Sequence, residues 1–581
     1  MKRTFYEVIN LSEADFENPK NKNKRIRETH GEILLFANTQ ETTAEELRDI
    51  LEENPFLKEM DAVAFGEGLP TGECSQAQIL SAPMTRFYAL SVKRSIFASC
   101  GSFHEKLQAG SNWEFLSRCA NAGTVFFVEC GSDTPTADPT HTEFRTDAPD
   151  AKPLAYTVLS AQKASPADPA LSHAVDSLVS ALSNTSLLQA FLSEMRSFTQ
   201  NPALFEEYRK ETSPILFLCD SETCYGIPRY LADGLMDTFA SKGFAVRNLS
   251  GPELTERFLK EPCRGIIGFQ TPFLEHALLR SKNCPRFQFW FDNPVYFQTL
   301  FQDRSDSYYV LCQDGGYAEY IRRYFGVLHA SHFPPGGRLP EYSFEELRCM
   351  ERDLDLVFLG TYYPEEKPWE SPDSDDPSSG LLYAYLLAHP EKPFEEAYLD
   401  LCPENSTDTE ADLPVQIAAF RPVFRAVTSH FRTQILESVL SSGLRIHVYG
   451  DSWDRFPDTW AGNLIRHPEA APEEAMEILR HTKISLNIMT WHKDGMTERI
   501  IHSMLCGAVC VSDESRYLRA HYQDGAEVAL FSLQETEKLP ALIRSLLSDS
   551  EKREAMAGKA YVHALREETW EQRVDELLRL L

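Results

Sequence analysis

One stretch near the carboxyl end constrains the fold more than any other part of the sequence. It consists of an apolar run, Ile484–Met489, a polar loop containing Gly495, a short amphipathic segment, and a second apolar run, Ala508–Val511. Short apolar runs bounded by loops are typical of buried strands, and here a helical pattern separates them. The stretch therefore predicts strand, loop, helix and strand, the repeating unit of a parallel α/β sheet.

The amphipathic segment has two different faces. At about 100° per residue, one side gathers Ile500, Ile501, Met504 and Leu505, and the other gathers Glu498, Arg499, His502 and Ser503. We expect the apolar face to pack on the sheet and the polar face to offer charge.

The start of this helix has the features of an anion site. Thr497 is a suitable N-cap, and a helix that follows a glycine-bearing loop presents free N–H groups to an anion. Arg499 adds a two-pronged guanidinium, and Asp513 falls at the carboxyl end of the next strand, where ligands of open α/β sheets bind. The pattern suits a diphosphate, although an ordinary surface helix with solvated charges is the alternative that composition alone favours.

The order of segments after LNIM also resembles a known family. TERIIHSMLCGAVCVSDES, DGAEVALFS and EETWEQRVDELLRLL follow one another as in the C-terminal domain of CgeB-like spore-maturation glycosyltransferases, which have the GT-B fold. Arg499, Gly507 and Asp513 match that family's pattern. His502 stands where an acidic residue is usual, and in the wider GT-B class that carboxylate often binds the ribose of the sugar nucleotide. Histidine can still hydrogen-bond a hydroxyl.

The resemblance implies a donor site at the carboxyl ends of the C-terminal strands. Gly360 and Gly450 each follow a predicted strand, Leu356–Leu359 and Arg445–Val448, and allow a ligand to approach the backbone. Trp453 lines this pocket or belongs to the core. The expected donor-binding residues are Gly360, Gly450, Asn487, Glu498, Arg499, His502, Gly507 and Asp513.

Composition limits the classes of partner. The 581 residues carry a net charge of -30, which argues against a nucleic acid or an anionic membrane surface as the main partner. Neither an N-terminal targeting signal nor a transmembrane segment is visible, so we expect a cytoplasmic protein. The 13 cysteines are scattered without CxxC pairs, a pattern that favours reduced core thiols over disulfides or zinc.

Residues 1–135 resemble parts of the GT-A fold of family 2 glycosyltransferases. The predicted strands Ile33–Ala37 and Thr124–Val128 flank a helix from about Asn112. In that family a DxD-type motif holds a metal and an aspartate acts as base. Here Asn38 and Gln40 lack hard anionic oxygens and Asn112 cannot accept a proton as a carboxylate does. We expect a degenerate, truncated GT-A-like domain with a structural or acceptor-presenting role; an unrelated α/β domain is the alternative.

The remaining domains follow from composition shifts and strand patterns. Residues 136–212 read as a linker and helical connector, 213–345 as a Rossmann-like domain without GxGxxG, and 346–581 as a second one with an insertion, Pro364–Pro414. The CgeB-like resemblance spans most of 213–581. In the first Rossmann-like domain we expect strands Ile215–Cys219, Ala245–Leu249, Gly265–Phe269, Phe287–Phe291 and Tyr308–Cys312. Aspartates follow three of these strands, at Asp220, Asp292 and Asp314, each a helix cap or a site residue.

These features predict an α/β protein with a GT-B type pair of Rossmann-like domains. Its expected function is metal-independent sugar transfer from a nucleoside-diphosphate donor on the C-terminal domain to an acceptor on the N-terminal one. The acceptor is a glycan, a lipid-linked compound or a protein, and no other cofactor is expected. Asp220 or Glu222 would act as base if the reaction inverts. The rivals are a non-catalytic binding or scaffold protein and, less favoured without a P-loop, a kinase or phosphatase.

Overall fold

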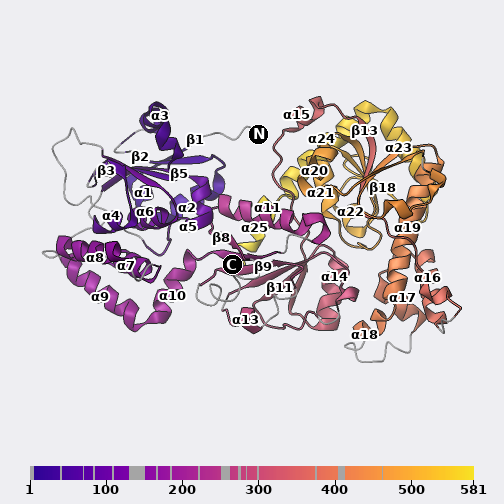
Figure 1. The fold of residues 1–581 in the computed structure, drawn as a ribbon, viewed down its shortest axis with the longest axis horizontal. Coiled ribbons are helices and arrows are strands. Elements are labelled where there is room, and N and C mark those ends of the chain that lie inside the picture. The colour runs from indigo at the N-terminus through magenta and orange to yellow at the C-terminus, as the bar shows by residue number, and fades with distance from the viewer. Residues whose placement is uncertain are drawn as a thin grey trace. The chain divides into compact units, whose positions relative to one another are not determined.

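The structure is a computed structural model. It describes residues 6–39, 42, 44–67, 69, 71–82, 86–107, 110–129, 151–164, 168–182, 186–219, 223–249, 262–271, 277–282, 284–297, 300–372, 376–402, 413–460 and 462–581. The described residues include three six-stranded sheets (Figure 1). The chain forms two compact units, one of Lys2–Phe217 with Met236–Ile266 and one of Leu218–Leu235 with Ile267–Leu581.

The first sheet is mixed. Its strand order is β1 (Tyr6–Leu11), β2 (Ile33–Asn38), β5 (Arg86–Lys93), β3 (Ala62–Glu67), β6 (Val125–Glu129) and β4 (Gly72–Glu73). The pairs β1–β2 and β3–β6 are parallel, and β5 runs antiparallel to both of its neighbours. The structure confirms the predicted strands β2 and β6, whereas β3 and β5 had no predicted counterpart.

Helices cover this sheet and continue beyond it. They are α1 (Glu13–Glu17), α2 (Pro19–Glu28), α3 (Ala44–Glu53), α4 (Gln76–Ser81), α5 (Phe97–Cys100), α6 (Ser111–Ala122), α7 (Lys152–Ala164), α8 (Pro169–Leu182), α9 (Ser186–Gln200) and α10 (Pro202–Glu211). Buried side chains of α7–α10 belong to the same hydrophobic core as those of the first sheet, from Ile9 to Phe205. The helical connector therefore completes the N-terminal core.

The second sheet has the order β12 (His329–His332), β11 (Tyr308–Cys312), β10 (Arg286–Trp290), β9 (Gly265–Phe269), β7 (Ile215–Leu218) and β8 (Val246–Asn248). The pairs β10–β11, β11–β12 and β7–β8 are parallel. All five predicted strands are found within two residues of their expected bounds. The helical segments of this region are η4 (Thr223–Gly226), α11 (Ile227–Ser241), α13 (Ala277–Arg280), η7 (Pro294–Tyr296), α14 (Gly315–Tyr320) and α15 (Phe344–Cys349).

The third sheet is parallel throughout. Its order is β15 (Leu464–His467), β14 (Ile446–Tyr449), β13 (Leu354–Leu359), β16 (Thr482–Asn487), β17 (Val509–Asp513) and β18 (Ala529–Phe531). The order reverses between β13 and β16, and such a reversal is where open α/β sheets bind ligands, beyond the carboxyl ends of the strands.

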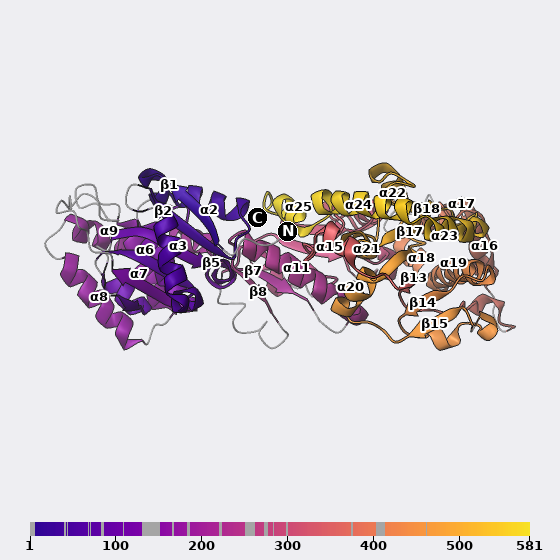
Figure 2. The same ribbon diagram turned by 90° about the horizontal axis from the view of Figure 1, so that it is seen from above.

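Helices flank the third sheet (Figure 1). They are α19 (Arg421–Ser441), α20 (Pro472–Arg480), α21 (Glu498–Leu505), α22 (Arg516–His521), α23 (Leu539–Ser548) and α24 (Ser550–Glu567), with α16 (Pro377–Ala388), α17 (Phe394–Leu401) and α18 (Leu413–Ala418) in the insertion. The predicted apolar face of α21 is buried in one core cluster with Ala560 and Ala564 of α24, the long helix seen from above in Figure 2.

The last helix, α25 (Trp570–Leu577), packs against the first Rossmann-like domain, residues 213–345, which we call the middle domain. Gly337 N–H donates to Glu568 O at 2.8 Å, and Trp570 N–H donates to Gly337 O at 3.0 Å. The Trp570 ring packs edge-on against Phe269 and Phe289 of the second sheet. The predicted α/β fold class with a pair of Rossmann-like domains is confirmed. Among the described helices, none combines the length and apolar character that a membrane crossing requires.

Candidate functional site

The carboxyl ends of β13 and β14 meet through their glycines. A side chain on Gly450 would put its Cβ only 2.4 Å from Gly360 O, and both residues have positive φ, 149° and 157°. Gly450 therefore allows the loops after β13 and β14 to touch. The sequence had suggested a different reason for this glycine, the close approach of a ligand. At Gly360 a Cβ would lie 3.1 Å from Arg499 Nη1, so this glycine makes room for the arginine.

Backbone strain gathers at the same edge of the two Rossmann-like sheets. Among the described residues, six that are not glycine have positive φ, and five of them follow strands at their carboxyl ends: Cys224, Tyr225, Gln270, Ser452 and Thr490. Such a conformation costs about 1–3 kcal/mol per residue and concentrates at functional sites. The strain therefore points to these loops as the site.

Two arginines flank the loop after β13. Arg499 Nη1 donates to Leu359 O at 2.8 Å, and Arg432 Nη1, from α19, donates to Thr361 O at 2.5 Å. The Nε atom of each arginine is buried without a hydrogen-bond partner, and neither guanidinium has an ion-pair partner among the described residues. Burial, with the charge of Arg499 as a second cause, lowers the pKa of Arg432 to about 10. Two adjacent guanidiniums, neither of them ion-paired with a carboxylate in the described part of the chain, suit an anion.

Asn487 and Asp513 shape the loop between β16 and α21. Asn487 donates from Nδ2 to Ser512 Oγ at 2.9 Å and accepts from Thr497 Oγ1 at 3.0 Å. The carboxylate of Asp513 accepts from the backbone N–H groups of Met489 and Thr490, at 2.7 and 2.8 Å. Both side chains are buried. The structure thus places them as supports of the loop, beneath the surface that a ligand would meet.

The two Rossmann-like domains touch through this loop. Asp314, the N-cap of α14, accepts from Gly316 N and from Asp494 N, at 2.7 and 2.9 Å. Gly315 N donates back to Asp494 O at 2.9 Å. Burial raises the pKa of Asp314 to about 6. Asp314 is therefore a cap, as one predicted alternative had it, and it also holds the loop that leads into α21.

Tyr225 makes a second contact between the domains. Its hydroxyl lies in hydrogen-bond contact with Thr361 Oγ1 and accepts from Asp451 N at 3.3 Å. The partners follow the two site glycines, Gly360 and Gly450. A tyrosine of the middle domain thus reaches the loops that we identify as the ligand-binding edge.

Two carboxylates that form no ion pair within the described ranges belong to the same edge. Glu498 opens α21 and is half-buried. Asp292 follows β10, and its Oδ2 accepts from Gln270 Nε2 at 2.7 Å. The surrounding protein raises the pKa of Asp292, mainly by desolvation and in part through the negative charge of Glu498. Asp292 is not a cap, because Asn293 caps the short helix that follows.

His502 corrects the predicted polar face of α21. Its side chain is 3% exposed and Ser503 is fully buried, so this face does not offer charge beyond Glu498 and Arg499. The His502 ring stands edge-on to Tyr230 of α11, 5.7 Å between centroids, and burial lowers its pKa to about 4. A helix of the other domain covers this side of α21, which the periodicity of one segment does not reveal.

The structure also gives the roles of Gly507 and Trp453. Gly507 lies at the end of α21 opposite to Glu498, with φ of 71°, and a Cβ there would lie 2.7 Å from Arg352 Nη2. It ends the helix and is not brought to the site. Trp453 is 3% exposed and donates from Nε1 to Gly360 O at 3.0 Å. It belongs to the core, the second of the predicted alternatives.

Some predicted site residues cannot be placed, and others were missed. Asp220 and Glu222 lie outside the described residues. Sequence reasoning missed Arg432 and Tyr225, which are 71 and 136 residues from Thr361. The sequence gives no signal for Arg432, since the same helix also carries Arg421 and Arg425.

The N-terminal domain holds a different cation. Lys22 is fully buried and donates from Nζ to Phe16 O at 2.8 Å, to Ser111 Oγ at 3.3 Å, and to Asn112 Oδ1. Its ammonium also lies 4.2 Å from the Phe103 ring centroid. Asn112, the residue at the GT-A base position, is therefore committed to an internal contact. Asn38 is buried at the end of β2, and Gln40 lies outside the described residues.

The described structure also contains a cavity away from the predicted site residues. A cavity of about 720 Å³ lies against α15 and α24, lined by residues that include Phe344, Arg348, Glu554, Lys559 and Arg566, and none of the predicted site residues lines it. Its charges are of both signs. Within the described ranges, His, Cys, Asp and Glu side chains form no cluster of three or more that could hold a metal.

Comparison with known proteins gives one family match. A model of the family described as glycosyl transferase-like matches residues 431–579, from within α19 to just beyond α25. No curated protein matches the chain.

Solved structures also match the chain at low similarity, and one of them, AviGT4, is described as a glycosyltransferase. TarM has a TM-score of 0.36 at 10% identity, covering 56% of each chain, so this chain spans about half the length of TarM. HepE from Anabaena in complex with UDP-glucose has a TM-score of 0.39 at 10% identity, covering 63% of this chain and 99% of that one. AviGT4, involved in avilamycin A biosynthesis, has 0.35 at 13%, covering 63% and 98%. The sequence from residue 431 to residue 579 is similar to that of glycosyl transferase-like proteins.

Proposed function

We propose that the protein transfers a sugar from a nucleoside-diphosphate donor, with the donor diphosphate held between Arg432 and Arg499. The observation that carries this proposal is the pair of guanidiniums beside Gly360, each with a buried Nε and without a carboxylate partner among the described residues. The glycosyl transferase-like match over 431–579 includes both arginines and supports the same function.

The two arginines suit the charge that develops in such a transfer. Breaking the bond between sugar and diphosphate leaves negative charge on the leaving group, and preorganised cations stabilise that charge. The N-terminus of α21 adds partial positive charge on the same side of Arg499. These groups would take over the charge neutralisation for which GT-A enzymes use a metal, so the proposed reaction is metal-independent.

The acceptor would meet the donor from the middle domain. Asp292 is a carboxylate of that domain whose environment raises its pKa and which, unlike Asp314, does not cap a helix; Gln270 fixes one of its oxygens. A carboxylate of this kind can take the proton from an attacking hydroxyl. Asp220 and Glu222, the residues that the sequence suggested, remain candidates for the same role.

We propose further that the protein is of the CgeB-like type and that its N-terminal domain is a GT-A remnant without catalysis. The sequence pattern around Arg499 supports the first statement. The hydrogen bond that Asn112 accepts from Lys22 supports the second statement, because a buried side chain that binds an internal ammonium is not available to a substrate. A non-catalytic nucleotide-sugar-binding protein is the alternative, and turnover separates the two.

Thermal unfolding in the presence of UDP, GDP, CDP and dTDP sugars tests the proposal. A ligand that binds the folded state raises Tm in proportion to the logarithm of its concentration over Kd. We expect at least one donor to raise Tm at millimolar concentration, and Arg499→Ala to abolish that rise. Arg566→Ala, a change at a side chain that is 71% exposed, is the control. If no nucleotide raises Tm, the proposed function is wrong.

A further inference from the structure

Two cysteines of the N-terminal unit lie side by side. Cys100 ends α5 and Cys119 lies in α6, and their Sγ atoms are 3.8 Å apart. A disulfide bond needs about 2.05 Å between the sulfurs, so the two side chains need to approach by less than 2 Å. Eighteen residues of chain separate them, and the ends of that segment are already together.

The two thiols differ in access and acidity. Cys100 is 7% exposed, whereas Cys119 is fully buried, so a small solute reaches Cys100 first. The hydrogen bond with Cys119 and the nearby charge of Arg118 lower the pKa of Cys100 against the effect of its burial. Burial raises the pKa of Cys119 well above its usual value. Cys100 is therefore the nucleophile of the pair, and Cys119 is the thiol that resolves its oxidised form.

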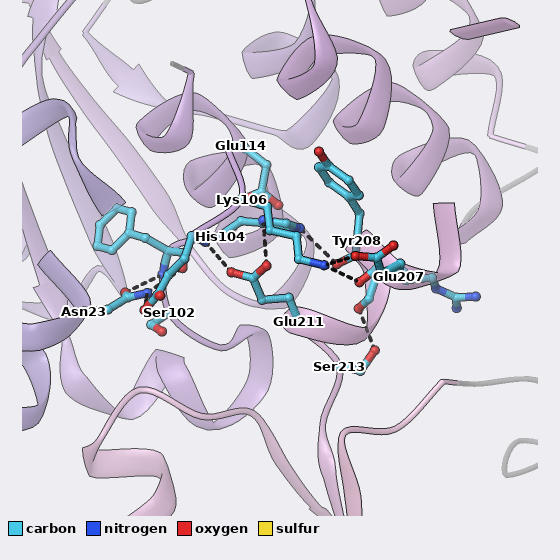
Figure 3. Close-up of polar contacts among 12 residues, drawn as sticks. Asn23, Ser102, His104, Lys106, Glu114, Glu207, Tyr208, Glu211 and Ser213 are labelled. Carbon is cyan, nitrogen blue, oxygen red and sulfur yellow. Dashed lines mark hydrogen bonds and ion pairs between the residues drawn. The ribbon is translucent and has the colours of Figure 1, made fainter. Parts of the chain in front are cut away.

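The segment after Cys100 is a junction of the N-terminal unit. Ser102 N donates to Gly243 O at 2.7 Å, and His104 Nε2 lies 2.9 Å from Tyr208 O. Glu105 N donates to Glu211 Oε1 at 2.5 Å. Figure 3 shows His104 and Glu211 turned toward each other, with Ser102 and Lys106 beside them. Cys100 thus immediately precedes a segment that contacts α10 and the turn after α11.

We propose that Cys100 and Cys119 form a reversible disulfide when the protein meets a peroxide, which makes this junction a redox-modified site. The Cys100 thiolate attacks one peroxide oxygen, the O–O bond breaks, and hydroxide leaves and is protonated to water. Cys119 sulfur then attacks the sulfenyl sulfur of Cys100. The S–O bond breaks as the S–S bond forms, and the departing hydroxide takes the Cys119 proton as a second water.

The test is peptide mapping of the full-length protein after treatment with hydrogen peroxide. Free thiols are blocked with N-ethylmaleimide and the protein is digested with trypsin without reduction. We expect the peptides 95–106 and 119–145 to be joined in most molecules, and dithiothreitol to separate them. The second peptide also contains Cys130, so the mapping is done in Cys130→Ser as well, where the link should persist.

Two variants sharpen the assignment of roles. Cys119→Ser should leave a sulfenic acid at Cys100 that dimedone traps, whereas Cys100→Ser should leave Cys119 unmodified at the same peroxide concentration. The oxidised wild type should also unfold at a Tm several degrees higher, since the link restrains the unfolded chain. The proposal is overturned if both cysteines of the treated wild type carry N-ethylmaleimide after unfolding, or if other cysteines are linked in equal yield.

Discussion

Lys22 in the N-terminal domain and the arginine pair of the C-terminal domain are all buried or partly buried cations, but they differ in the hydrogen-bond partners that surround them. Lys22 has neutral oxygen partners and lies over an aromatic ring, so its burial is compensated within the domain. Arg432 and Arg499 each keep a buried Nε without a partner. The comparison teaches that a buried cation is part of the core when its surroundings satisfy it, and marks a site when they do not.

Replacing the enclosed cation should have the largest effect on stability. Lys22→Ala leaves a cavity and three acceptors without their donor, which we expect to cost about 2–5 kcal/mol of unfolding free energy. Urea unfolding measures it. Lys24→Ala in the same helix, at a side chain that is 67% exposed, is the matched control and should change stability by less than about 0.5 kcal/mol. Nucleotide affinity should stay the same in both variants; a loss in Lys22→Ala alone would break the distinction between the two cations.

Asp314 links the two Rossmann-like domains in a pH-dependent manner. Its pKa is raised from 3.8 to about 6, so the folded state binds the proton more tightly than the unfolded state between these values. Its contribution to stability is therefore full below about pH 4 and is lost as the pH rises through about 6, a change of about 3 kcal/mol at most. Tm measured from pH 4 to 7 should fall less steeply in Asp314→Asn than in the wild type. Equal slopes would contradict the assignment.

The open cations should affect binding more than folding. Arg432→Ala and Arg499→Ala each remove a charge-assisted contact, which we expect to weaken binding of the donor nucleotide by about 10- to 150-fold, or about 1.5–3 kcal/mol. Calorimetric titration measures the affinity. Tm without ligand should move little, because neither change alters the buried apolar side chains of α19 or α21. If either variant loses stability while its affinity for the nucleotide stays the same, its arginine is a structural residue like Lys22.

Tyr225 should give the smallest effect. Tyr225→Phe removes the hydroxyl contacts to Thr361 and Asp451 but keeps the ring, so we expect a loss of about 0.5–1 kcal/mol in stability and less than about a fivefold change in nucleotide affinity. Tyr363→Phe, at a side chain that is 57% exposed, is the control for loss of a hydroxyl, since Tyr363 lies in the loop that contains Thr361. A large loss of affinity would place Tyr225 in direct contact with the donor.

Local pattern was sufficient for much of the fold. The runs that form β7, β9, β11 and β16 are apolar and bounded by polar turns, and Thr497 caps α21 as its position predicts, although its side chain makes no capping hydrogen bond. β15 was missed because LIRH has only two apolar residues, followed by two polar ones, and so shows neither an apolar run nor an alternating pattern. A strand this short carries little signal until its neighbour β14 is known.

The site was harder to predict than the fold because it depends on contacts between distant segments. Arg499 and Gly360 were predicted together and lie together, since both are at carboxyl ends of adjacent strands. Arg432 reaches the same loop from a helix that follows the long insertion, and nothing in its own segment specifies this approach. His502 was misjudged for the same reason, because Tyr230, 272 positions away in the chain, covers it.

A crystal structure of the protein soaked with UDP at millimolar concentration tests the central claim most directly. We predict that the diphosphate lies against the loop after β13, with its oxygens within about 3.2 Å of guanidinium nitrogens of both Arg432 and Arg499. A diphosphate bound elsewhere, or arginines that keep their present neighbours while the nucleotide occupies another pocket, would contradict the account.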